Sequence, residues 1–115
     1  MAEPIKILEG ERLSSVVFIH DYVQLGFDGT GLTINASLTV VTGGKSYKKG
    51  EPCYRDALCE RIGQTVRRAF TVTGKQIVIQ FENDSEIIIS LRPEDQVSPE
   101  AAVLYSDSQP ICVWN

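Results

Sequence analysis

Alternation of apolar and polar residues is the feature that most constrains what this chain can fold into. Residues 22–27 alternate a polar or small residue with Val, Leu and Phe, a Gly-rich Asp-Gly-Thr-Gly segment follows at 28–31, and residues 32–34 read Leu-Thr-Ile. Successive side chains of a strand point to opposite faces, so this pattern predicts strands with one buried face. Two such runs around a glycine-containing turn predict an antiparallel β-hairpin.

The same arrangement recurs in the second half of the chain. Residues 77–81 and 86–91 are apolar runs around the polar turn 82–85, and a β-rich run precedes each hairpin, at 13–19 and at 65–73. We interpret this as two copies of a three-stranded meander, and therefore as a possible internal repeat of residues 11–42 and 60–92. The two copies begin alike, with Glu11-Arg12-Leu13 and Glu60-Arg61-Ile62. The alternation alone does not establish a duplication, because any two β-meanders share it.

A helix is predicted between the two copies, over about residues 52–62. Pro52 suits a first helical turn, Gly63 suits a left-handed cap, and apolar residues fall at helical spacing between them. The preceding residues 42–50 contain Gly-Gly and Lys-Lys and are interpreted as an exposed loop. Near the C-terminus, a final hairpin of residues 101–105 with 110–114 is favoured over a short helix beginning at Ser98-Pro99.

These elements predict one α+β domain spanning residues 1–115. We expect six to eight largely antiparallel strands, in a sheet or a partly closed barrel, with the single helix between the halves. The predicted core consists of Val16, Phe18, Val23, Leu25, Phe27, Ile34, Leu58, Val66, Phe70, Ile77, Ile79, Phe81, Ile87 and Ile89.

The charge of the chain argues against nucleic acid as a partner. The net charge is −4, and the basic clusters are short, at residues 45–49 and 67–68. Affinity for nucleic acid comes largely from Lys and Arg that neutralise phosphates. No window holds the ~18 apolar residues of a membrane-spanning helix, and residues 1–10 lack the features of a signal peptide. We therefore expect a cytoplasmic protein without a membrane partner.

Catalytic and metal-binding patterns are not found in the sequence. The single histidine, His20, is followed by Asp21, and adjacent residues of a strand point apart, so a polar turn is the favoured interpretation. Cys53, Cys59 and Cys112 form no close ligand pair and are interpreted as reduced, buried, structural thiols. We predict no enzyme, no cofactor and no metal, with a small-ligand-binding β-barrel or a small enzyme using His20 as the alternatives.

Surface aromatic residues are the remaining functional signal. Amphipathic aromatic side chains often anchor protein interfaces, although they also cap a core near the ends of strands. The possible interface residues are Tyr47, Tyr54, Tyr105 and Trp114. The expected partner is another protein or a second copy of the chain, joined through an edge strand.

Five segments, taken in order, resemble a group of small bacterial domains of unknown function. They are residues 23–29, 63–66, 79–83, 99–103 and the C-terminal Ile-Cys-Val-Trp at 111–114. Those domains contain a repeated β-hairpin with an Asp-Gly turn, and some occur near toxin–immunity loci. Here Asn83-Asp84-Ser85 replaces the second Asp-Gly. The resemblance implies a non-catalytic domain of unknown or immunity-type function, and it carries over no binding residue.

Overall fold

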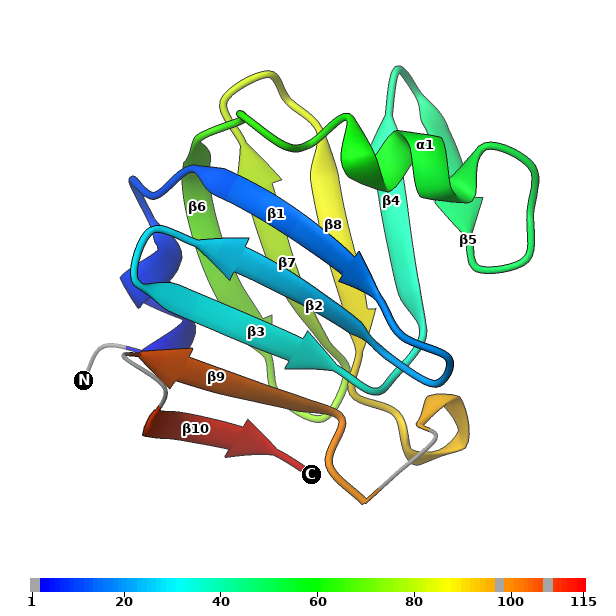
Figure 1. Cartoon of the computed structure of the whole chain (residues 1–115). Helices are drawn as coiled ribbons and strands as arrows, with labels where there is room; N and C mark the ends of the chain where they lie inside the picture. Colours follow the sequence, from blue (N-terminus) through cyan, green and yellow to red (C-terminus); the bar gives the residue numbers. More distant parts are fainter. Residues whose placement is uncertain (1–2, 97–98, 107–108) are drawn as a thin grey trace.

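Two five-stranded antiparallel sheets form the architecture of the chain (Figure 1). The computed structural model describes residues 3–96, 99–106 and 109–115. One sheet has the order β1-β2-β3-β9-β10 and the other β5-β4-β8-β7-β6. Their bounds are β1 Leu13–Phe18, β2 Val23–Phe27, β3 Thr30–Ile34, β4 Leu38–Thr42, β5 Lys45–Lys48, β6 Val66–Val72, β7 Gln76–Phe81, β8 Glu86–Ser90, β9 Ala102–Ser106 and β10 Gln109–Trp114. Two 3-10 helices, η1 (Pro4–Leu8) and η2 (Pro93–Asp95), and the α-helix α1 (Tyr54–Cys59) complete the described residues.

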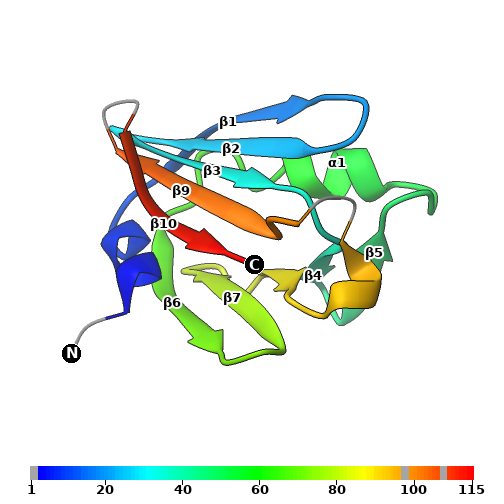
Figure 2. The same cartoon turned by 90° about the horizontal axis from the view of Figure 1, so that it is seen from below.

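The two sheets face each other and bury their apolar sides between them (Figure 2). Twelve of the predicted core positions pack there, fully or in part, which confirms the alternation on which they were chosen. Two predictions need correction. Phe18 is 37% exposed at the end of β1, and Phe70 lies on the outside of β6 beneath the guanidinium of Arg68, 4.5 Å from its ring centroid. Val16 and Val23 pack against the core but are only partly buried.

The number of strands and the closure of the sheet differ from the prediction. The described residues contain ten strands rather than six to eight, and the sheets do not close into a barrel. Residues 42–50, predicted as a loop, include β5, which forms a hairpin with β4 across Gly43 and Gly44. Both glycines have positive φ, 59° and 77°, as a tight two-residue hairpin turn requires. The predicted C-terminal hairpin is confirmed by the pairing of β9 with β10.

The helix is shorter than predicted and begins later. It spans Tyr54–Cys59 instead of about 52–62, because Cys53 adopts a left-handed conformation (φ 70°) that stops the helix from extending back to Pro52. Its buried residues Tyr54, Ala57 and Leu58 close one end of the space between the sheets. In Figure 1 the helix lies beyond β1, on the side away from β2, and close to β4 and β5.

The two halves of the chain have the same topology. β1-β2-β3 and β6-β7-β8 are consecutive three-stranded meanders, one in each sheet. Each half then sends a two-stranded hairpin, β4-β5 or β9-β10, to the edge of the other half's meander, where β4 pairs with β8 and β9 pairs with β3. A short helix, η1 or α1, precedes each meander. The fold is therefore a pseudo-two-fold arrangement in which the halves exchange their last two strands.

Reciprocal backbone hydrogen bonds mark the centre of this arrangement. The N–H of Leu13 donates to Gln64 O (3.0 Å) and the N–H of Val66 donates to Glu11 O (2.8 Å). A β-bulge follows each of these two residues, between Leu13 and Ser15 and between Val66 and Arg68. The structural equivalents of residues 11–13 are therefore 64–66, and not the Glu60-Arg61-Ile62 that the sequence pattern suggested.

Candidate functional site

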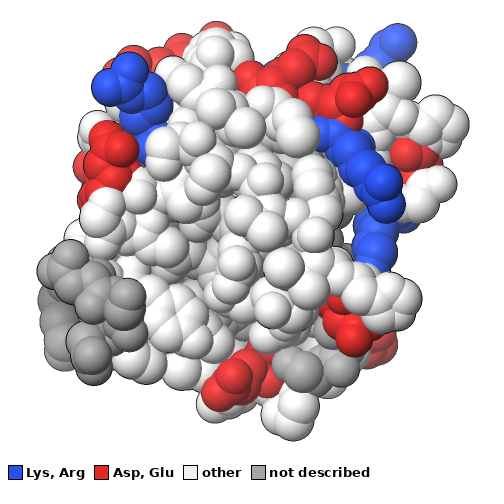
Figure 3. Space-filling model, viewed as in Figure 1, with Lys and Arg blue, Asp and Glu red and all other residues white. Residues whose placement is uncertain are grey.

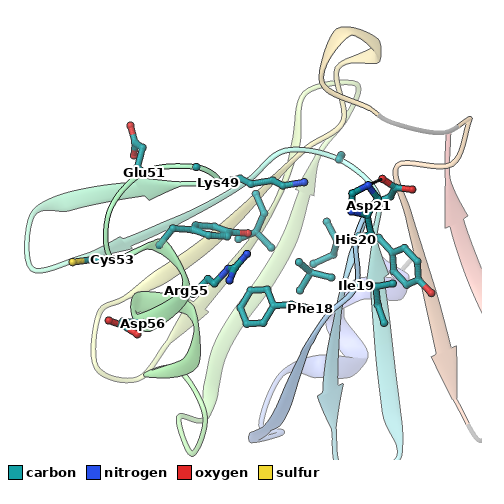
Figure 4. A pocket seen from close by; sticks show the side chains of 16 residues that line it. Phe18, Ile19, His20, Asp21, Lys49, Glu51, Cys53, Arg55 and Asp56 are labelled. Carbon is teal, nitrogen blue, oxygen red and sulfur yellow. Dashed lines mark ion pairs between the residues drawn. The ribbon is translucent and has the colours of Figure 1, made fainter.

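A side pocket of about 690 Å³ opens between the β1–β2 turn and the N-terminal end of α1 (Figure 4). Its wall on one side consists of residues 18–23, from the end of β1 through the turn into β2. The opposite wall consists of residues 49–51 and 53–56, from the segment before α1 and its first residues. Ile34, Ala36 and Leu38 form the apolar floor where the chain crosses between the sheets. A cavity of this size falls within the usual range for small-molecule sites.

Aromatic rings and a guanidinium meet inside the side pocket. The rings of Phe18 and Tyr54 pack edge to face with centroids 6.5 Å apart. The guanidinium carbon of Arg55 lies 5.8 Å from the centroid of Phe18, within the range of a cation–π contact. Burial raises the pKa of the Tyr54 hydroxyl, and the Arg55 charge opposes that rise. The hydroxyl therefore stays protonated at neutral pH.

Positive charge predominates among the side chains that extend into the side pocket. Figure 4 shows Lys49 and Arg55 reaching into the cavity, whereas Glu51, Cys53 and Asp56 point away from it. The Glu51 carboxylate accepts a hydrogen bond from the N–H of Lys48 (2.8 Å), which holds it in the turn before α1. Within the described ranges neither Lys49 nor Arg55 forms an ion pair. The interior of the pocket therefore offers two cations that form no ion pair with any described residue, beside an apolar floor.

His20 and Asp21 lie at the outer rim of the side pocket. They occupy a two-residue turn closed by reciprocal backbone bonds between Ile19 and Tyr22, which confirms the favoured interpretation of a polar turn. In this turn His20 Nε2 lies 3.5 Å from Asp21 Oδ1. Their side chains are 95% and 74% exposed. This pair lies in water, without the burial that usually tunes a catalytic dyad.

The free edge of β1 runs along the same side of the molecule. Ile19 and Tyr22 form a hydrogen-bonded pair, and such pairs alternate along an antiparallel ladder. The N–H groups of Val16 and Phe18 therefore point away from β2, toward the side on which α1 lies (Figure 1). The structure shows no acceptor for either group in the part of the chain that it describes. Phe18 thus presents both its ring and an unpaired donor at the side pocket.

A second surface feature is the outer face of the sheet β1-β2-β3-β9-β10, which we call the uncharged face. Charged residues make up 23% of the chain, yet these five strands contain no Asp, Glu, Lys, Arg or His. The strands of the other sheet contain Lys45, Lys48, Arg67, Arg68 and Glu86. Figure 3 shows the uncharged face as a broad white area with Lys, Arg, Asp and Glu around its margin.

Two rows of side chains make up the uncharged face. One row crosses all five strands through Val17, Gln24, Thr33, Val103 and Val113. The other runs through Ser15, Gly26, Gly31, Tyr105 and Pro110. The paired glycines carry no side chain, which leaves a shallow depression of about 230 Å³ beside Tyr105. Val17, Ile111 and Val113 are each at least 40% exposed.

The four predicted interface residues do not come together. Tyr54 is buried in the wall of the side pocket, and Tyr105 lies on the uncharged face. Tyr47 and Trp114 are partly buried against the core. This packing fits the alternative interpretation, in which aromatic residues cap the core near the ends of strands.

The cysteines differ from the prediction of buried thiols. Cys53 and Cys59 are exposed, and Cys112 is half-buried against the core. Desolvation raises the pKa of the Cys112 thiol, with a smaller opposing effect of the Val113 backbone N–H. Across the described ranges, no three His, Cys, Asp or Glu residues gather as potential metal ligands. No helix in the part of the chain seen here is long and apolar enough to cross a membrane.

The side pocket was missed by the sequence analysis because its walls come from segments some 30 residues apart. The uncharged face could have been predicted from the sequence, because the segments that form its strands contain no charged residue. Fold and surfaces together define a two-sheet antiparallel β domain with an uncharged face and a basic side pocket. Comparisons with protein-family models, curated proteins and solved structures found no match to the chain.

Proposed function

We propose that the protein is a non-enzymatic binding module that associates with a second copy of itself through the uncharged face. The observation that carries this proposal is the absence of charged residues from the five strands of one sheet, in a chain of net charge −4. Two acidic molecules repel each other, and contact through a face without charge avoids close like-charge pairs. Val17, Ile111 and Val113 supply exposed apolar surface on this face, and its margin supplies a polar rim.

The size of the face indicates a weak dimer. Five strands about 4.8 Å apart and about 18 Å long give a flat area of roughly 430 Å². A standard interface buries about 800 Å² on each partner, so side-chain relief and the flanking turns must contribute the rest. We therefore expect a dimer that dissociates on dilution and a rapid exchange between monomer and dimer.

Sedimentation equilibrium over a concentration series tests the proposal. We expect the mean mass to rise from the 12.7 kDa of the chain toward twice that value between about 10 µM and 1 mM. Thr33→Arg places a cation at the centre of the uncharged face and should hold the protein at the monomer mass. A monomer mass for the wild type across the whole series would overturn the proposal.

A matched substitution on the other sheet provides the control. Thr39 is half-buried on the outside of β4, as Thr33 is on the outside of β3. Thr39→Arg should leave the concentration dependence unchanged, because it adds the same charge to the charged sheet. Equal effects of the two substitutions would contradict a role for the uncharged face. The resemblance to immunity-type domains suggests a different protein as an alternative partner, and a strictly monomeric wild type would favour that alternative.

A further inference from the structure

The free edges of β1 and β6 are equivalent in the fold, but their backbone N–H groups differ in whether they have hydrogen-bond acceptors. At β6, the N–H of Ala69 donates to Glu9 Oε2 (3.0 Å) and the N–H of Thr71 donates to Glu3 Oε1 (2.8 Å). The segment that contains η1 thus closes this edge with carboxylates. Counting from the paired bulges, the equivalents of these donors on β1 are the N–H groups of Val16 and Phe18.

No carboxylate closes the edge of β1 within the described residues. The helix α1 occupies the position equivalent to η1, but between it and the end of β1 lies the side pocket. Phe18 N–H, the equivalent of the donor that Glu3 satisfies, is therefore left at the pocket wall. Asp21, Glu51 and Asp56 line the side pocket, yet no described carboxylate accepts a hydrogen bond from the edge of β1 as Glu3 and Glu9 do at β6.

We propose that the side pocket binds a small organic carboxylate whose body is apolar. Its carboxylate accepts a hydrogen bond from Phe18 N–H, in the way that Glu3 accepts one from Thr71. Lys49 and Arg55 extend into the cavity, form no ion pair with any described residue, and supply the compensating charge (Figure 4). Hydrogen bonds from charged donors to a carboxylate are among the stronger polar contacts in proteins.

The lining of the pocket defines the rest of the ligand. Phe18 and Tyr54 offer aromatic surface, and Ile34, Ala36 and Leu38 offer an aliphatic floor. A planar or branched apolar group can pack there while its acid group faces the two cations. The β1–β2 turn and α1 bound the cavity on two sides, which favours a small molecule over a continuing polypeptide. This site is separate from the uncharged face, so it does not depend on self-association.

Titration of ¹⁵N-labelled protein with 4-phenylbutyrate tests the proposal by NMR. We expect saturable shifts confined to the residues of the side pocket, with a downfield shift of the Phe18 amide proton as it gains an acceptor. The uncharged analogue 4-phenylbutanamide has the same apolar body and should bind at least about tenfold more weakly. Equal binding of the acid and the amide, or shifts that map to other surfaces, would overturn the proposal.

Substitution of Lys49 and Arg55 provides a second test of the proposed carboxylate site. Arg55→Gln and Lys49→Gln, both at exposed positions, should each weaken 4-phenylbutyrate binding by roughly tenfold while leaving the amide's affinity unchanged. Lys45→Gln removes a cation of β5 that does not line the pocket and should have no effect. If all three substitutions weaken binding equally, the acid is attracted by the overall charge of the protein and the assigned site is wrong.

Discussion

Glu9 Oε2 accepts a hydrogen bond from the backbone N–H of Ala69 at 3.0 Å, across 60 residues of the chain. Its neighbour Lys6 donates to the carbonyl of the same residue, Ala69, at 3.2 Å. An exposed edge strand presents unpaired backbone groups that invite association with other strands. The N-terminal segment satisfies these groups on β6 and thereby removes that edge as a pairing site.

The pairing of Glu9 with Ala69 predicts an acid-dependent loss of stability. The hydrogen bond from Ala69 N–H, helped by the nearby Lys6, holds the pKa of Glu9 below its ordinary value, against an opposing effect of desolvation. A lowered pKa stabilises the fold above the unfolded-state value, and this contribution is lost as the pH falls through the folded-state value. Glu9→Gln should lower the melting temperature by a few degrees at pH 7 and by less at pH 3.

Thermal unfolding followed by circular dichroism at the two pH values measures this difference. Glu60→Gln is the control, because Glu60 is exposed and its side chain makes no hydrogen bond or ion pair among the described residues. A melting temperature of the Glu9 variant that stays equally depressed at both pH values would show that the carboxylate charge is irrelevant.

The packing of η1 against the core predicts that substitutions at two adjacent residues change the free energy of unfolding by very different amounts. Leu8 is fully buried in the core, whereas Ile7 is 45% exposed. Leu8→Ala should reduce the free energy of unfolding by about 2–5 kcal/mol, because it removes buried methyl groups and leaves a cavity. Ile7→Ala should change it by about 0.5 kcal/mol or less. Urea unfolding measures both, and similar small values for the two variants would mean that η1 is not part of the core.

A half-buried acid near the start of β1 predicts a stabilising substitution. Desolvation raises the pKa of Glu11, the hydrogen bond from Thr30 Oγ1 (3.3 Å) opposes the rise, and Asp28 adds to it. Glu11 Oε1 is buried and has no hydrogen-bond partner among the described residues. A raised pKa stabilises the fold only below the unfolded-state value, and this contribution is lost as the pH rises through the folded-state value.

Glu11→Gln should therefore stabilise the protein at pH 7.5. The amide still accepts from Thr30 but carries no charge to desolvate, and the gain should be roughly 0.5 kcal/mol because solvent screens much of the effect. At pH 4, where the wild-type carboxyl gains its proton, the difference should shrink or reverse. Urea unfolding at both pH values measures this, and a destabilised variant at pH 7.5 would contradict it.

The exposure of the thiols predicts their order of alkylation. Iodoacetamide at pH 8 should modify Cys53 and Cys59 much faster than Cys112, because the thiolate is the nucleophile and burial disfavours it at Cys112. Peptide mass spectrometry at successive times gives the three rates. Denaturation in urea should make the rates converge, and Cys112 reacting as fast as the others in the native protein would rule out its packing against the core.

The sequence pattern predicted the strands of both meanders closely because period-two alternation reports directly on one buried face. It did not predict β5, whose Lys-Ser-Tyr-Lys sequence contains a single apolar residue at a half-buried position. It also placed the start of α1 too early, at Pro52. The helix begins after Cys53 because Cys53 is left-handed, and the sequence gives no sign of this because cysteine rarely adopts that conformation.

By itself, the sequence determined the strands of the two meanders, which of their faces are apolar, and which segments lack charge. Only the tertiary structure decided that β4 crosses to β8 and β9 to β3, which divides the strands into two sheets instead of one. Alternation specifies the buried face of a strand but not its partner, because backbone hydrogen bonds are the same for any neighbour. The side pocket also depends on the tertiary structure, because it is the space left between α1 and the end of β1.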